Sequence, residues 1–487
     1  MVVTNPPETM SQRSVFQRLL LIWAVGFIAR AVYAMLAPGF HARDDYFHVL
    51  APALEWLDNP AWNWTLSGTP GAGIRSHLLP KIVQGLLASS ADLGPLSQLR
   101  VVGVIMAAWS SLIVPFSWPL IRALAPTKHT TQLILLWLLS LHPALIYGAP
   151  KLLIEVQCIP MLMGALSLMV TSRRDWHYVA AGACFGGATY IRYQTLTAAS
   201  AAVAFLLASQ LPASSRLKKL ACMLSGTGFA IVLGGWYDLL TDGRFLGPLI
   251  QNIAVNLTPP DDLTRSSSLT YVGTILVLLC PWVLHRIQWR EIVRNPAWLC
   301  ILTGTATFVV AHSLTPHKEE RFLFPVVGLI ILIAGTLWTT LDRPRLRLSL
   351  FVYHIVLLVV LFGINPQQAT REALAQYPST NNDVIVSLGP EVQSFFIRPK
   401  TAIIERNRKF DPTWVGQQVT KHSDKTFFVL SYKPQREAVL LALKSADLMC
   451  DAAESFDQNW ADSLAYKLNP RHNLRRSTIE TRICSVQ

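Results

Sequence analysis

Long apolar runs recur along most of the first 364 residues, with short polar or basic loops between them. A run of about 20 apolar residues is long enough to cross the hydrocarbon core of a bilayer as a helix. The pattern predicts an all-α polytopic membrane protein with about 11 transmembrane helices. The predicted helices cover residues 15–37, 101–124, 130–148, 152–171, 176–191, 194–212, 219–240, 269–286, 297–314, 322–340 and 347–364.

The short loops that are rich in basic residues all fall on one side of this arrangement. If residues 1–14 form a cytoplasmic tail, the cytoplasmic loops hold Arg122, Lys128, Arg173, Arg174, Arg216, Lys218, Lys219, Arg286, Arg290, Arg294, Arg343, Arg345 and Arg347. This asymmetry agrees with the positive-inside rule. The exoplasmic face then receives the long first loop, the loop at 241–268, the string after His317 and the whole C-terminal region.

The first exoplasmic loop, residues 38–99, is too long to be a simple connection. Residues 44–57 and 75–88 have apolar positions at helical spacing with polar interruptions, which predicts two amphipathic helices on the membrane surface.

After about residue 363 the pattern changes. Residues 384–388, 401–405 and 427–432 are typical of short strands, and residues 436–450 are typical of a helix. We therefore predict a transmembrane catalytic domain at 15–364 and a small exoplasmic α/β domain at 365–487. Cys450 and Cys484 both lie in this domain, and we predict that they form a disulfide in an oxidising space.

Composition supports the membrane interpretation. The chain is 52% hydrophobic and 15% charged, whereas soluble domains carry about 25% charged residues. The 42 lysines and arginines outnumber the 29 acids, but they lie in short loops and form no basic stripe, so nucleic acid is excluded as a partner. No nucleotide-binding, serine-hydrolase or metalloprotease motif is present, and we expect no cofactor and no metal.

Two strings concentrate unusual charges on the exoplasmic face. His317, Lys318, Glu319 and Arg321 stand with Glu320 at the mouth of a predicted span, where they could hold an anionic lipid headgroup and a sugar. The alternative is an interfacial cluster whose long side chains extend to water. Asp44 and Asp45 begin the first amphipathic helix beside His48. One acid is enough to cap the N-terminus of a helix, so the presence of two also suggests that a carboxylate here acts as a general base.

Three further ionisable residues are candidates. Glu155 follows Lys151 by one helical turn near the end of a span, which fits either a functional site or a local ion pair. Arg192 at another exoplasmic turn could bind phosphate or extend to the interface, and Arg75 in the first loop could bind phosphate beside His77 and Lys81.

With these residues in place, the chain resembles the Alg9-like mannosyltransferase family, which has the GT-C membrane fold. The family string HKExRFLxP is matched by His317, Lys318, Glu319, Arg321, Phe322, Leu323 and Pro325. The family motif HPDExFQ is similar to HARDDYFH, which has an extra residue after His41, Asp45 in place of Glu and His48 in place of Gln. These departures concern the acceptor more than the chemistry.

The resemblance implies an inverting mannosyltransferase. Mannose would move from a polyprenyl (dolichyl) phosphate to a glycan or glycolipid acceptor, with Asp44 as the base and Asp45 beside it. His317, Lys318, Arg321 and Arg75 would hold the donor phosphate, and the remaining substrate contacts would come from Glu319, Glu155, Arg192 and His48.

Alternatives remain open at this point. A GT-C transferase for another polyprenyl-phosphate sugar would use a similar site. A transporter would have ionisable residues spread across the depth of the membrane and an internal repeat that relates its two halves. A non-catalytic receptor would leave the paired acids without a role. The host membrane is predicted to be the endoplasmic reticulum or a bacterial inner membrane, with the site on the lumenal or periplasmic face.

Overall fold

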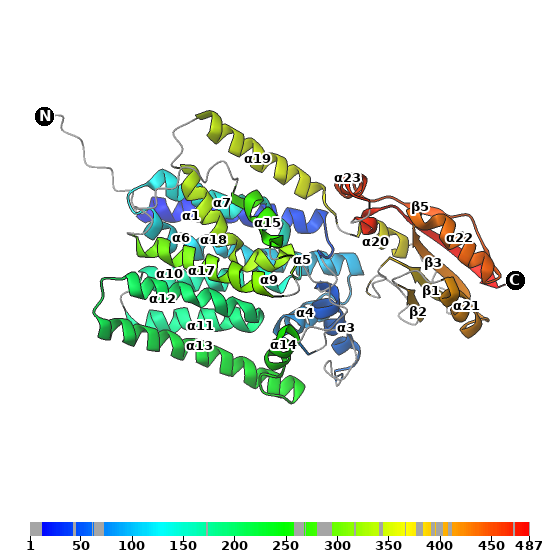
Figure 1. Cartoon of the computed structure of the whole chain (residues 1–487), viewed down its shortest axis with the longest axis horizontal. Helices are drawn as coiled ribbons and strands as arrows, with labels where there is room; N and C mark the ends of the chain where they lie inside the picture. Colours follow the sequence, from blue (N-terminus) through cyan, green and yellow to red (C-terminus); the bar gives the residue numbers. More distant parts are fainter. Residues whose placement is uncertain are drawn as a thin grey trace. The chain divides into compact units, whose positions relative to one another are not determined.

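The chain folds into two compact units (Figure 1). In the computed structural model, the first unit falls within residues 1–35, 47–89 and 101–358, and the second within residues 36–46, 90–100 and 359–487. The structure describes residues 12–41, 45–60, 62, 73–171, 174–257, 267, 269–279, 295–315, 318–339, 344–365, 367–375, 383–390, 395, 403–407, 412–470 and 473–486.

Eight helices in the described ranges are long and apolar enough to cross a membrane, and they confirm eight of the predicted spans. They are Arg13–Leu36, Pro95–Leu124, His129–Gly148, Ile154–Thr171, Ala213–Asp242, Pro296–Leu314, Glu320–Thr339 and Pro344–Ala375.

Two of the other predicted spans are shorter or interrupted in the structure, and the third, 269–286, is described only in part. Residues 175–191 form a 17-residue helix, and residues 193–208 form a 3-10 helix followed by a short α-helix. The two are separated because Arg192 leaves the helical conformation, with φ −137° and ψ 97°. Of the span predicted at 269–286, the structure describes the helix Thr270–Leu279.

The helices up to residue 363, most of which lie wholly in the first unit, begin and end at recognisable residues. The Asn295 side chain accepts a hydrogen bond from the Ala297 amide at 2.9 Å and caps α17, and Gly243, with φ 72°, ends α13. The bounds are α1 Gln12–Leu36, the π-helix η1 Tyr46–Leu50, α3 Ala51–Asp58, α4 Leu78–Ser89, α5 Pro95–Ser111, α6 Ile113–Leu124, α7 His129–Leu141, α8 Pro143–Gly148, α9 Ile154–Gln157, α10 Ile159–Thr171, α11 Asp175–Ile191, η3 Tyr193–Ala199, α12 Ser200–Ala208, α13 Ala213–Asp242, α14 Gly247–Leu257, α15 Thr270–Leu279, α17 Pro296–Leu314, η5 Glu320–Leu323, α18 Phe324–Thr339 and α19 Pro344–Gly363.

Helices α11 and α13 lie side by side and pack very closely (Figure 1). A Cβ atom at Gly182 would come within 2.0 Å of the Met223 carbonyl oxygen, and one at Gly226 within 2.0 Å of the Val179 carbonyl oxygen. Small residues permit such backbone approach between membrane helices. The close packing brings Tyr190 at the end of α11 beside Asp238 near the end of α13.

The two helices predicted in the first loop are confirmed as η1 with α3 and as α4. They pack against each other, and Trp56 of α3 is buried between them. The Gln84 side chain donates to the Trp56 carbonyl at 3.0 Å, and the Lys81 ammonium lies 3.8 Å from the Trp56 ring centroid.

The second unit contains a six-stranded sheet in the order β2-β1-β3-β6-β4, with β5 also paired to β6. The strands are β1 Asp383–Leu388, β2 Ile403–Asn407, β3 Thr426–Tyr432, β4 Leu448–Cys450, β5 Glu454–Phe456 and β6 Ile479–Val486. β1 is parallel to β2 and β3, and β6 is antiparallel to β3, β4 and β5. Its helical elements are α20 Gln368–Ala375, α21 Pro412–Lys421, η7 Lys433–Gln435, α22 Arg436–Ser445, α23 Trp460–Leu468 and η8 Leu474–Arg476.

Alternation along the strands gives this sheet two buried faces. Ile385 and Phe428 pack with α20 on one face. Their sequence neighbours Val384 and Phe427 pack with α21 and α22 on the other. The helix predicted at 436–450 was too long, because α22 ends at Ser445 and Leu448–Cys450 pairs with β6 as a strand. Asp447, with a positive φ of 54°, makes the turn between them.

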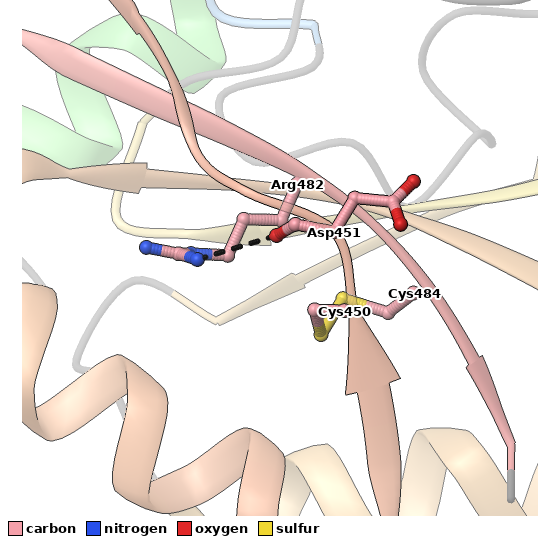
Figure 2. The surroundings of a disulfide bond; sticks show 4 residues. All are labelled: Cys450, Asp451, Arg482 and Cys484. Carbon is pink, nitrogen blue, oxygen red and sulfur yellow. Dashed lines mark hydrogen bonds between the residues drawn. A yellow bond between two sulfur atoms is a disulfide. The ribbon is translucent and has the colours of Figure 1, made fainter.

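The predicted disulfide between Cys450 and Cys484 is confirmed (Figure 2). The two cysteines stand opposite each other on β4 and β6, and Arg482 on β6 donates to the Asp451 carbonyl at 3.5 Å. The bond therefore ties the short strand β4 to the longest strand of the sheet.

Removing this disulfide should destabilise the second unit. For a sequence separation of 34 residues, we expect the double substitution Cys450→Ser/Cys484→Ser to lower the free energy of unfolding by about 3–4 kcal/mol, because the unfolded chain regains loop freedom. Thermal unfolding of the purified protein with and without reductant measures the effect. The Cys158→Ser variant is the control, since Cys158 is buried and forms no disulfide, and an equal loss there would contradict the assignment.

Candidate active site

The predicted site residues divide between the two units. Asp44 and His317 lie outside the described residues. Asp45 belongs to the second unit. The first unit contains His48, Arg75, Glu155, Arg192, Lys318, Glu319 and Arg321.

Glu155 and Arg192 form a buried ion pair at the centre of the first unit's polar site. Glu155 lies on the short helix α9, and Arg192 caps the C-terminus of α11. The Arg192 Nη2 atom is 3.4 Å from Glu155 Oε1, and both side chains are 2% exposed. A local pair between Lys151 and Glu155 is not the arrangement seen, because the helix starts only at Ile154. The Lys151 ammonium instead lies 5.2 Å from the ring centroid of Tyr33.

The ring of Phe322 supports two arginines. The guanidinium carbon of Arg192 is 4.8 Å from the ring centroid, and that of Arg321 is 5.2 Å from it. Such stacking holds guanidinium groups in defined positions. The short helix η5 presents Arg321 and Phe322 together, so the segment that matches the family string HKExRFLxP contributes both a cation and the ring on which a second cation lies.

Arg321 is already engaged by its neighbour Glu319. Its Nε atom donates to Glu319 Oε2 at 2.7 Å and its Nη2 atom donates to Oε1 at 3.0 Å. Arg75 from the first loop lies close enough for its charge to act on both Glu155 and Arg192. The cluster thus contains three guanidinium groups and two carboxylates. Their formal charges sum to one positive unit. Lys318 and Glu320, which flank Glu319 in sequence, add one positive and one negative charge and leave this sum unchanged, which suits a bound anion.

Several buried polar atoms around this pair make no hydrogen bond within the described part of the chain. They are Arg192 Nε and Nη1, Glu155 Oε1, Tyr271 OH and His312 Nε2. Burying such groups without partners is costly, so their concentration points to a polar ligand or ordered water. Burial lowers the pKa of Arg192, in the turn after α11, to about 10, and Glu155 opposes that shift. The guanidinium remains charged at neutral pH.

Tyr271 and His312 were missed by sequence reasoning. Tyr271 packs against Phe322 and Leu323, and the His312 ring donates from Nδ1 to the Phe308 carbonyl at 2.9 Å. His312 lies in a predicted span, and an ionisable residue inside an apolar run is a functional candidate. That pattern would have identified His312, whereas nothing in the sequence distinguishes Tyr271 from the other aromatic residues of the helices.

A second buried polar cluster lies around Asp238. Tyr190 OH donates to Asp238 Oδ1 at 2.5 Å, and His77 Nδ1 lies 3.7 Å from the same oxygen. Asp238 Oδ2 has no hydrogen-bond partner among the residues described. Arg75, His77 and Lys81 were predicted to act together on phosphate. The structure separates them, with Arg75 near Glu155, His77 at Asp238 and Lys81 over Trp56.

Breaking the contact between Tyr190 and Asp238 should reduce stability. We expect Tyr190→Phe to lower the free energy of unfolding by about 1–3 kcal/mol, because a buried carboxylate loses its donor. Denaturant unfolding of the solubilised protein measures the change. Tyr193→Phe is the matched control, since the Tyr193 hydroxyl makes no hydrogen bond in the part of the chain that the structure describes. Equal losses in the two variants would exclude the hydrogen bond as the cause.

Asp45, in the second unit, has a structural contact of its own. Its Oδ2 atom accepts the His41 backbone amide at 2.8 Å, and the side chain is buried. This contact ties the backbone at His41 to the side chain four residues later. Asp45 therefore has a structural contact of its own within the acidic pair Asp44–Asp45, called the acidic motif below, and the role of base is proposed for Asp44.

The family model of the Alg9-like mannosyltransferases matches residues 21–382. The chain belongs to this family. It is 32% identical over 163 residues to GPI mannosyltransferase 4 of Schizosaccharomyces pombe, a match that covers 32% of this chain and 28% of that protein. The aligned part thus spans less than a third of this curated relative.

Solved structures agree with the family assignment at the level of the fold. ArnT from Cupriavidus metallidurans bound to undecaprenyl phosphate has a TM-score of 0.57 at 11% identity, over 95% of this chain and 97% of that chain. The apo oligosaccharyltransferase of Archaeoglobus fulgidus has a TM-score of 0.51 at 11% identity, over 87% and 71%. The predicted fold, a helical membrane domain of GT-C type with a small C-terminal sheet, is confirmed.

Proposed function

We propose that this protein is an inverting membrane mannosyltransferase that moves mannose from a polyprenyl phosphate to a glycan or glycolipid acceptor. The observation that carries the proposal is the buried cationic cluster around Arg192, with its unsatisfied guanidinium nitrogens and its net positive charge. The family membership supports the sugar and the donor class.

The reaction needs a base on one side of the sugar and cations on the other. An acceptor hydroxyl gives its proton to the Asp44 carboxylate as its oxygen bonds to C1 of mannose. The bond from C1 to the phosphate oxygen breaks with inversion, and the leaving lipid phosphate gains one negative charge. Arg192, Arg75 and Lys318 stabilise that charge electrostatically, which needs no metal ion in the step itself. Arg321 acts more weakly, because Glu319 shares its charge.

The exoplasmic location of the site also belongs to the proposal. The basic loops predict that residues after about 363 lie outside the cytoplasm, and the Cys450–Cys484 disulfide supports an oxidising compartment. For the acceptor, the name of the fission yeast relative supports a glycolipid of the GPI type. An endoplasmic reticulum membrane agrees with both points.

The decisive experiment is a transfer assay with the purified, reconstituted chain. Labelled polyprenyl-phosphate mannose is supplied with GPI-type glycolipids or lipid-linked oligosaccharides as acceptors, and Asp44→Asn is the control. We expect label to enter the glycolipid fraction with inverted configuration. Transfer from a nucleotide sugar, or no covalent product with any acceptor, would overturn the proposal.

The same assay separates the alternatives. Polyprenyl-phosphate glucose, arabinose and aminoarabinose are tested in parallel. Preferential transfer of one of these sugars would leave the proposed reaction chemistry unchanged but would show that the donor sugar is not mannose. Movement of intact donor across the vesicle membrane without glycosyl transfer would indicate a transporter. The clustering of Arg75, Arg192 and Arg321 at one place in the bundle favours transfer chemistry over a path through the membrane.

A further inference from the structure

The start of the first exoplasmic loop folds with the C-terminal region. Residues 36–46, which contain the acidic motif, belong to the same compact unit as residues 359–487. Sequence reasoning placed the whole first loop in the transmembrane domain and left the C-terminal domain without a role. The shared unit raises the question of what holds residues 36–46 to it.

One attachment is made by Arg371 of α20. Its Nη1 atom donates to the Pro38 carbonyl oxygen across 333 residues of sequence, and its Nη2 atom donates to Asn365 Oδ1 at 2.6 Å. The Arg371 side chain is buried. The backbone carbonyl of Asn365 accepts in turn from the Asn459 side chain at 3.1 Å, and Asn459 caps α23. The arginine is thus held by the C-terminal fold while it binds the loop.

A second attachment lies on the other side of the acidic motif. The Tyr46 hydroxyl accepts the Phe395 backbone amide at 3.4 Å. The Tyr46 ring is buried and meets Phe40 edge to face, with centroids 5.5 Å apart. Between the two attachments, the His41 backbone amide donates to the Asp45 carboxylate at 2.8 Å. These contacts hold described residues that precede and follow Asp44 in sequence.

We propose that the C-terminal α/β unit is a positioning device for the acidic motif, with Arg371 as the clamp that fixes the chain at Pro38. Arg371 is a positioning residue and touches no substrate in this scheme. A base displaced by about 1 Å can lose about 10²-fold in rate, so restraining the backbone beside Asp44 has catalytic value. The catalytic part of this inference rests on the proposed function, whereas the clamp itself is a structural statement.

The experiment compares Arg371→Ala with Arg371→Lys in the full-length reconstituted protein. Arg475→Ala is the matched control, because Arg475 is an exposed arginine of the same unit. Hydrogen exchange of peptides covering residues 36–46 and steady-state transfer kinetics are both measured. Arg371→Ala should speed exchange in these peptides and lower kcat about 10²-fold, with the KM for the donor little changed. Arg371→Lys should recover part of both losses, and Arg475→Ala should match wild type.

Unchanged exchange of residues 36–46 in Arg371→Ala would overturn the clamp. Altered exchange with unchanged kcat would overturn the positioning role. If Arg371→Ala fails to fold, Tyr46→Phe removes only the second attachment and keeps the ring, and it should speed exchange in the same peptides. A wild-type chain with no transferase activity would refute the proposed function, while the exchange data would still decide whether the clamp exists.

Discussion

Asp44→Asn should nearly abolish sugar transfer while leaving donor binding close to normal. A general base contributes about 10²–10⁴-fold to a rate, and an amide cannot accept the proton of the acceptor hydroxyl. We expect kcat to fall by this factor. Single-turnover transfer measures the chemical step, and equilibrium binding of a non-hydrolysable donor analogue measures the affinity.

Asp45→Asn is the matched control for Asp44. An asparagine oxygen can still accept the His41 amide, so this hydrogen bond is kept and most activity should survive. If Asp44→Asn retains near-normal kcat, or if Asp45→Asn is the more damaging of the two, the base has been assigned to the wrong residue.

Arg192→Met should reduce kcat/KM for the donor by about 10²–10³-fold, because the leaving phosphate loses a cation aimed at its developing charge. It should also lower the free energy of unfolding by about 3–5 kcal/mol, since Glu155 remains buried and loses the cation that it pairs with. Arg192→Lys should recover part of the affinity for the donor, because the charge is restored, but a lysine cannot make the two parallel hydrogen bonds of a guanidinium group. Donor titrations and thermal unfolding measure the two effects.

The double variant Glu155→Gln/Arg192→Met separates catalysis from folding. It removes both buried charges, so most of the stability should return while transfer remains impaired. Recovery of activity along with stability would show that Arg192 serves only the fold. An unchanged transfer rate in Arg192→Met would show that Arg192 does not stabilise the donor phosphate.

Much of this site was predictable because its residues are chemically unusual in their surroundings. Arg192 and Glu155 are ionisable groups beside or within apolar runs. Placing a charge in a membrane costs free energy, so such residues are functional candidates before the fold is known. The roles of Arg321 and Phe322 were harder to predict. The family string shows that they stand together, but only the coordinates show that Glu319 binds Arg321 at two points and that Phe322 lies under Arg192.

Local patterns failed where distant segments decide the outcome. Residues 448–450 continue a helical pattern, yet they form a strand because β6 offers an edge and Cys484 lies opposite Cys450. Lys151 and Glu155 have helical spacing, but Leu152 and Leu153 between them are not helical, and Glu155 faces an arginine 37 positions away in sequence.

The membrane class, most of the spanning helices, the two loop helices and the family strings could be predicted from the amino-acid sequence, because each depends on residue type and short-range period. Two features could be seen only in the folded chain. Arg192 has two guanidinium nitrogens without a hydrogen bond among the described residues, and residues 36–46 fold with the C-terminal sheet. The reason is physical. Burial and periodicity are properties of a segment, whereas the partner of a charge is chosen by the packing of elements far apart along the chain.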